Sequence, residues 1–105
     1  MEILDFSYNW NNKLNCNSFT TLRLRNDNKY FITKHFEVQL KGESRGIHMV
    51  VDVKHFKITQ INEFIARLDT GYNQVECVKL IQTIYKNKPI DWNTQQLSLI
   101  LLVKK

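Results

Sequence analysis

The chain has few of the residues that mark several specialised protein classes. Its 105 residues include three glycines, one proline and two cysteines. Three glycines cannot form a glycine-rich phosphate-binding loop. The cysteines, Cys16 and Cys77, are too far apart for a Cys-x-x-Cys motif. We expect two reduced thiols, with Cys77 in the protein core on the apolar side of its helix.

Long hydrophobic runs are absent as well. The longest, Leu99–Val103, is the length of a strand, whereas a membrane helix needs ~20 apolar residues. The N-terminal residues include no basic start or apolar stretch of the kind that directs secretion. We therefore expect a cytoplasmic protein that has no contact with a membrane.

Metal-ligand spacing is missing too. The three histidines are scattered, and no His-Glu-x-x-His motif occurs. We expect neither a metal nor another cofactor.

The remaining composition is that of a globular domain. Hydrophobic residues make up 43% and charged residues 24%, which excludes a disordered chain. The length predicts a single domain over residues 1–105. The formal net charge is +5, and residues 53–105 carry eight of the basic side chains against four acidic ones. A small basic domain favours anionic partners, of which RNA or a nucleotide comes first.

The hydrophobic pattern predicts an α+β fold. Residues 19–25 and 96–103 alternate as strands do, and residues 36–53 read as a hairpin around a loop at 42–46, with Ile47, Met49, Val51 and Val53 on the apolar face. Two helices are expected at 56–68, capped by Thr59, and from Asn73 to about Lys86, with Gly71 between them. Ile3, Leu4, Phe6, Trp10 and Leu14 are expected to form one short helix packed on the core. Because the helices cluster between strands, the sheet should be mostly antiparallel and can be barrel-like. The apolar helix stripes are expected to be Ile61, Phe64, Ile65 and Leu68, and Val75, Val78, Ile81 and Tyr85.

Two groups of polar residues are candidates for a site. Thr21, Arg23 and Arg25 share one strand face, where forked guanidinium donors suit phosphate or a base edge, although the arginines could instead pair with acids such as Asp52. Asp69 lies at a helix end beside Gly71 and Tyr72, where it could accept a hydrogen bond from a nucleobase or merely shape the turn.

The segment from Leu14 to Arg23 resembles the signature of ASCH domains, which belong to the PUA-like superfamily. That signature is roughly Leu-x-Gly-x-Lys-Thr-x-Thr-x-Arg, and its second Thr and its Arg fall on Thr21 and Arg23. The likeness continues through Tyr30–Thr33, Gly46 and the Ile84-Tyr85 pair, over nearly the whole chain. It implies a small PUA-like β-barrel with two or three helices at its rim and a cleft over the first strand.

The resemblance also implies function. ASCH domains are proposed to bind RNA, and some small members remove the acetyl group of N4-acetylcytidine with a Lys, a Thr and a Glu. Here the signature Lys falls on Ser18, and Asp69 is the carboxylate near the Glu position. Lys13 and Lys34 are the candidates to supply the missing amine.

The leading hypothesis is a module that binds RNA or a modified nucleoside, with Ser18, Thr21, Arg23, Asp69 and Tyr72 around the ligand. The alternative is an amidohydrolase of N4-acetylcytidine or a related nucleoside, with Thr21 and Asp69 as its catalytic residues. A second alternative is a protein-interaction module that uses an apolar patch around Trp10 and Trp92. Candidates for outer phosphate contacts are Arg25, Lys54, Lys57, Lys86 and Lys88.

Overall fold

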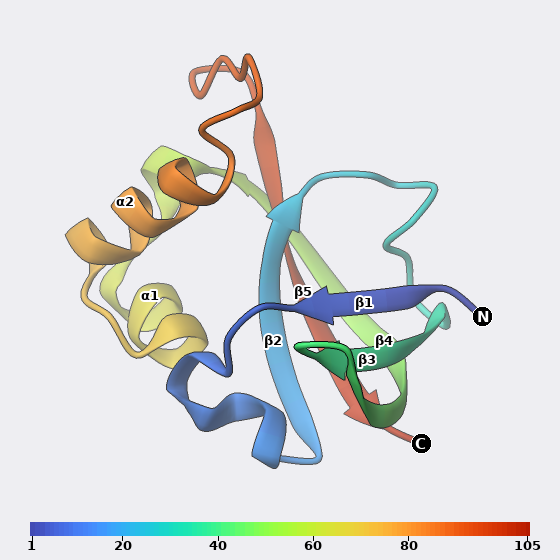
Figure 1. Cartoon of the computed structure of the whole chain (residues 1–105). Helices are drawn as coiled ribbons and strands as arrows, with labels where there is room; N and C mark the ends of the chain where they lie inside the picture. Colours follow the sequence, from blue (N-terminus) through green and yellow to red (C-terminus); the bar gives the residue numbers. More distant parts are fainter.

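A computed structural model describes all residues, Met1–Lys105, and has an α+β fold. Two α-helices lie together on one side of a sheet, next to β2 (Figure 1). In chain order the elements are β1 (Ile3–Phe6), the 3-10 helix η1 (Trp10–Asn15), β2 (Ser18–Leu24), β3 (His35–Leu40), β4 (Glu43–Lys57), the 3-10 helix η2 (Ile58–Gln60), α1 (Glu63–Thr70), α2 (Gln74–Ile84) and β5 (Gln96–Lys104).

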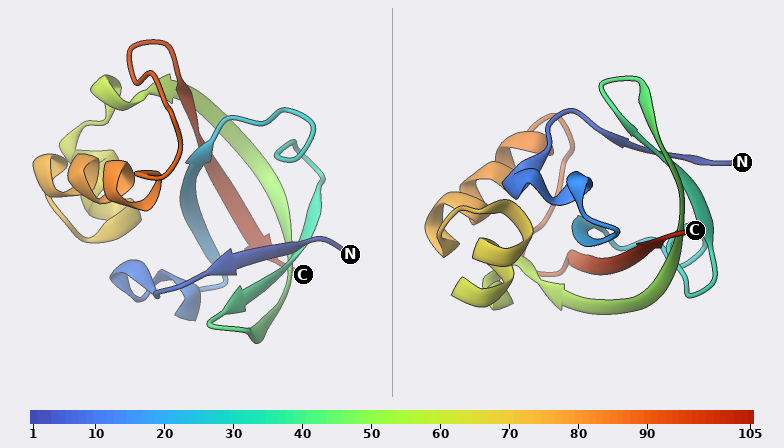
Figure 2. Two further views of the ribbon diagram at one scale, coloured as in Figure 1. Left: turned by 45° about the horizontal axis from the view of Figure 1, so that its top comes forward. Right: turned by 90° about the horizontal axis from the view of Figure 1, so that it is seen from below.

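The five strands form one curled sheet in the order β1-β3-β4-β5-β2. Only the β1–β3 pair is parallel, and the other three pairs are antiparallel, as expected for most of the sheet. Figure 2 shows the sheet bent into an open half-barrel, with β1 crossing its open side. The edge strands β1 and β2 do not pair with each other, so the barrel has an open seam between them.

The apolar side chains form two cores, one on each side of β2. The first fills the curl of the sheet and includes Phe6, Phe19 and Phe36. The second lies between the sheet and the helices and includes Ala66, Cys77 and Leu97, with Leu22 and Leu24 of β2 packed against it. The expectation that Cys77 is a core residue is confirmed, since its side chain is fully buried.

The central hairpin is tighter than the sequence pattern predicts. Leu40 pairs with Glu43, so the connection is the two-residue turn Lys41-Gly42 and not a loop over 42–46. Both turn residues have positive φ, 51° at Lys41 and 84° at Gly42, which matches the twist of the flanking strands.

The predicted inward face of β4 is wrong at its start. His48 and Val50 are buried, whereas Ile47 is 41% exposed. The register then shifts between Val50 and Asp52 in the pairing with β5, and this bulge returns Val53 to the first core. A bulge changes which residues face inward, and a strict two-residue period cannot reveal it.

The helices begin and end where their caps are. Asn62, not Thr59, caps α1 by accepting a hydrogen bond from the Ile65 amide, while residues 58–60 form η2. Asn73 caps α2 and Gly71 ends α1 in the left-handed region at φ 81°, both as predicted. The predicted apolar stripes are only partly buried, because Phe64, Leu68 and Val75 are exposed and Tyr85 is half-buried.

The N-terminal segment is not a single helix. Residues 3–6 form β1 and pair with β3, and η1 follows as a kinked 3-10 helix. Asn11 and Asn12 sit in its interior at φ 57° and 54°. Asparagine adopts this left-handed conformation more readily than most residues, so the chain can kink here.

Candidate functional site

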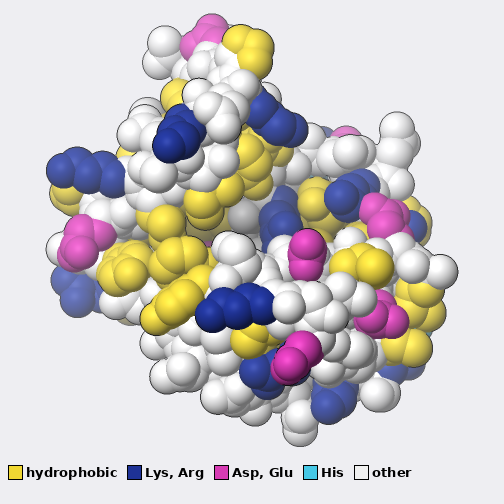
Figure 3. Space-filling view, in the orientation of Figure 1, with side chains coloured by type: hydrophobic (Ala, Val, Ile, Leu, Met, Phe, Trp, Pro, Cys, Tyr) yellow, Lys and Arg dark blue, Asp and Glu magenta, His cyan; other side chains and the backbone are white.

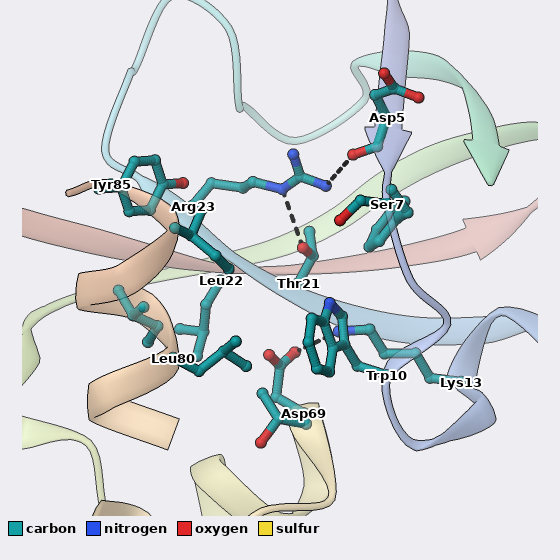
Figure 4. A pocket seen from close by; sticks show the side chains of 14 residues that line it. Asp5, Ser7, Trp10, Lys13, Thr21, Leu22, Arg23, Asp69, Leu80 and Tyr85 are labelled. Carbon is teal, nitrogen blue, oxygen red and sulfur yellow. Dashed lines mark hydrogen bonds and ion pairs between the residues drawn. The ribbon is translucent and has the colours of Figure 1, made fainter. Parts of the chain in front are cut away.

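A pocket of about 140 Å³ lies at the seam between β1 and β2, next to α2 and η1. Figure 3 shows it as a hollow with hydrophobic atoms on one wall and basic side chains beside it. Figure 4 shows the side chains that line it: Asp5, Phe6, Ser7, Trp10, Lys13, Thr21, Leu22, Arg23, Asp69, Thr70, Leu80, Ile81, Ile84 and Tyr85.

A buried ion pair stands at the base of this pocket. The Lys13 ammonium nitrogen lies 3.0 Å from Asp69 Oδ1, and the two side chains are 7% and 4% exposed (Figure 4). Thr20 Oγ1 donates a second hydrogen bond to the same carboxylate oxygen at 2.8 Å. The carboxylate is thus held by two donors from η1 and β2 and can be reoriented only by breaking both.

Burial lowers the pKa of Lys13 below the ordinary lysine value, because the charged form loses its hydration. The negative charge of Asp69 opposes this effect and the positive charge of Arg23 adds to it. A lysine with a lowered pKa gives up its proton more readily, which is what a general base requires.

Thr21 lies one residue beyond Thr20 on β2 and lines the pocket, at 3% exposure. Its hydroxyl oxygen accepts a hydrogen bond from Arg23 Nε at 3.1 Å. A cationic donor on this oxygen stabilises negative charge there, and the hydroxyl proton stays free to be donated. The arrangement therefore suits a nucleophilic or hydrogen-bonding role for Thr21.

Arg23 also bridges the open seam of the sheet. Its Nη2 donates to the backbone oxygen of Asp5 at 3.0 Å, and its guanidinium carbon lies 4.7 Å from the centroid of the Phe6 ring. These contacts fix the guanidinium plane at the pocket wall. No hydrogen bond engages Nη1 within the chain, so this nitrogen can donate to a ligand.

Local polar contacts bring Lys13 to Asp69 although they are far apart in sequence. The side chain of Asn9 accepts a hydrogen bond from the Leu14 amide and so closes the turn that carries Lys13. The Asn11 side chain donates to the Leu68 carbonyl at 3.2 Å, at the C-terminal end of α1. The kinked η1 is therefore docked on the turn of α1 that presents Asp69.

The structure gathers some of the predicted site residues and separates others. Thr21, Arg23 and Asp69 line one pocket, whereas Ser18 is exposed at the start of β2 and does not line it. Tyr72 stands outside the pocket and contacts Trp10, with ring centroids 5.9 Å apart.

The predicted outer cations are all exposed. Arg25 is paired with Asp27 at 2.9 Å and does not contact Asp52. Lys54, Lys57, Lys86 and Lys88 form no ion pair. The two tryptophans of the interaction hypothesis lie in separate aromatic groups, since Trp92 packs on Tyr85 and Trp10 on Tyr72 and Tyr8.

The sequence did not decide which of two lysines supplies an amine to the pocket, and the structure does. Lys34 pairs with Glu2 at 3.0 Å and does not line the pocket, so Lys13 is the lysine that shares the pocket with Thr21. Trp10 was singled out only as part of an apolar interaction patch. The α2 residues in the lining carried no sequence signal for a site, because an apolar residue facing a pocket looks like a core residue.

Comparisons with protein-family models, with curated proteins and with solved structures find no significant match. No group of three His, Cys, Asp or Glu side chains is placed to hold a metal ion. Neither α-helix has the length and hydropathy needed to cross a bilayer.

Proposed function

We propose that this protein is an amidohydrolase that removes the acyl group from an N-acylated pyrimidine nucleoside such as N4-acetylcytidine. The observation that carries the proposal is the buried amine of Lys13, which shares one pocket with Thr21 and Asp69. Lysine, threonine and a carboxylate are the three groups that the ASCH resemblance implies for this chemistry. Here the lysine comes from η1, five residues before the signature position at Ser18.

The chemistry assigned to these groups is acyl transfer to Thr21 and then to water. Neutral Lys13 accepts the Thr21 hydroxyl proton as the oxygen attacks the amide carbon, and then donates that proton to the departing nitrogen as the C–N bond breaks. Water cleaves the resulting ester in the same manner, giving the carboxylic acid, the free amine and the original enzyme. Asp69 orients Lys13, and Arg23 stabilises charge on the Thr21 oxygen.

The aromatic and polar groups of the pocket support a nucleoside as the substrate, of which one part enters the pocket. Its volume is close to the ~150 Å³ of a cavity that takes up benzene, so it holds one small group and not a complete nucleoside. Trp10 offers an aromatic face at the wall on which a base can stack. The free nitrogen of Arg23 can donate to a ring carbonyl.

The test is incubation of the purified protein with N4-acetylcytidine and quantification of released cytidine by chromatography. We expect turnover that Thr21→Val and Lys13→Met each reduce by at least a hundredfold, since they remove nucleophile and base. Lys34→Met serves as the matched control, because this lysine is paired on the surface, and it should retain full activity.

Circular dichroism of each variant separates loss of chemistry from loss of folding. Absence of cytidine release by the folded wild-type protein contradicts the proposal. Equal activity of the folded Lys13→Met variant contradicts the role of Lys13 while leaving the reaction itself in place.

A binding role without catalysis, toward RNA or a modified nucleoside, is the second candidate. It is favoured by exposed lysines that form no ion pair, among them Lys86 and Lys88, which directly follow the helix that lines the pocket. Such a module should bind a short single-stranded RNA with an affinity that falls steeply with salt. Lys86→Gln/Lys88→Gln should reduce that salt dependence, whereas an affinity independent of ionic strength contradicts this role.

A further inference from the structure

The pocket has two chemically different walls. The polar groups come mainly from η1, β2 and the end of α1, whereas the opposite wall comes mostly from α2 and is aliphatic apart from Tyr85 at the end of that helix (Figure 4). Ile81 is 4% exposed and belongs to the second core, Leu80 is half-buried, and Ile84 is 56% exposed, so the wall runs from the second core out to solvent. The residues of the aliphatic wall are Leu22, Leu80, Ile81 and Ile84.

The pocket volume admits only part of an acylated nucleoside. Pockets that enclose a drug-sized ligand measure roughly 300–1,000 Å³. At about 140 Å³ this pocket has room for either the base or the acyl group. The nature of each wall decides which of the two enters.

The base fits better at the mouth than inside. A flat heterocycle gains most by stacking on an aromatic ring, and Trp10 begins a chain of such rings that leads outward. Its ring centroid lies 5.9 Å from that of Tyr72 and 4.6 Å from that of Tyr8, and these tyrosines are 39% and 53% exposed. A branched aliphatic wall has no flat face for stacking, but it packs well against a hydrocarbon chain.

We propose that the α2 wall is an acyl-chain subsite that selects straight aliphatic acyl groups longer than acetyl. The base lies against Trp10, the amide carbonyl lies over Thr21 and the chain extends along Leu80 and Ile84. This inference rests on the proposed amidohydrolase function and names the substrates that the function prefers. An acetyl group reaches Thr21 but leaves the aliphatic wall uncovered.

Each methylene that leaves water for an apolar wall favours the bound transition state by about fourfold. N4-butyrylcytidine has two more methylenes than N4-acetylcytidine, so its kcat/KM should be about fifteenfold higher. Chains of six or more carbons should lose this advantage, because the pocket cannot contain them.

The experiment measures kcat/KM for N4-acetyl-, N4-propionyl- and N4-butyrylcytidine, which share one leaving group. Rates of alkaline hydrolysis correct for intrinsic reactivity. Leu80→Ala should reduce the butyryl-to-acetyl ratio at least threefold and raise the rate for hexanoylcytidine. Val75→Ala is the matched control, because this α2 residue is 60% exposed and does not line the pocket, and it should leave the ratio unchanged.

The outcomes separate the two proposals. Hydrolysis of acetylcytidine with no gain for longer chains, or a ratio unaffected by Leu80→Ala, overturns the subsite and leaves the amidohydrolase standing. Absence of hydrolysis for all three substrates overturns both.

Discussion

Lys13 and Asp69 form a buried ion pair across 56 positions of sequence, with Nζ and Oδ1 3.0 Å apart. The pair lies where η1 meets the end of α1, directly beneath the pocket. Removing two charges from water is costly, and the attraction between them together with the Thr20 hydrogen bond must offset that cost. Keeping such a pair buried lowers the stability of the fold. Features of this kind are typical of functional sites.

The ion pair should show strong coupling between its members. Lys13→Met leaves the Asp69 carboxylate buried without its cation and should lower the free energy of unfolding by about 3–5 kcal/mol. Lys13→Met/Asp69→Leu removes both charges and should recover most of that loss. Urea denaturation of the single and double variants measures the coupling, and additive losses would contradict it.

The pH dependence of the proposed reaction should report the protonation state of Lys13. Because the base must be neutral, kcat/KM should rise with pH through the pKa of Lys13 and then level off, below the ordinary lysine value of about 10.4. The charge of Asp69 raises this pKa, so Asp69→Asn should move the rise to lower pH. A pH–rate profile of both proteins tests this, and a shift to higher pH would exclude Lys13 as the base.

Arg23 should hold the seam of the half-barrel together. Arg23→Met removes two hydrogen bonds and the contact with Phe6, and should cost about 1.5–3 kcal/mol. Amide hydrogen exchange should accelerate in β1 more than in α2. Arg25→Met is the control, since its pair with Asp27 is exposed and screened by solvent and should contribute little. Equal effects of the two substitutions contradict a bridging role.

The hairpin turn offers a stabilising substitution. Lys41 is held at φ 51°, a conformation that costs an ordinary L-residue roughly 1–2 kcal/mol. Lys41→Asn should raise the free energy of unfolding by about 0.5 kcal/mol, because asparagine tolerates this region. Thermal denaturation checks the gain, and Gly42→Ala, at φ 84°, should move the melting temperature the other way.

His48 should make the fold sensitive to mild acid. Burial lowers its pKa, with Lys104 adding to the shift, although its hydrogen bond to the Gly46 carbonyl opposes it. As pH falls below about 6.5 the unfolded chain binds a proton that the folded chain refuses, so stability decreases, by at most about 1.4 kcal/mol per pH unit. Urea denaturation at pH 7.5 and 5.0 should show a larger loss for wild type than for His48→Gln, and equal losses would contradict this.

The candidate site was only partly predictable from sequence. Thr21 and Arg23 stand two residues apart on one strand, so their shared face follows directly from the two-residue period. Asp69 could be placed near them only through the ASCH resemblance. Lys13 could not be preferred over Lys34, since the choice depends on how η1 docks against α1.

The sequence by itself determined the α+β class, the last strand, the cap of α2 at Asn73 and the end of α1 at Gly71, because these depend on local periodicity and on contacts within a few residues. Only the tertiary structure decided the inward face of β4, where His48 is buried and a bulge after Val50 shifts the register, and the exposure of Phe64 and Leu68 on α1. The tertiary structure also decided which residues come together in the candidate site. A pocket with a buried amine requires η1, β2 and α1 to meet at the open seam of a curled sheet, and that meeting is a property of packing between distant segments.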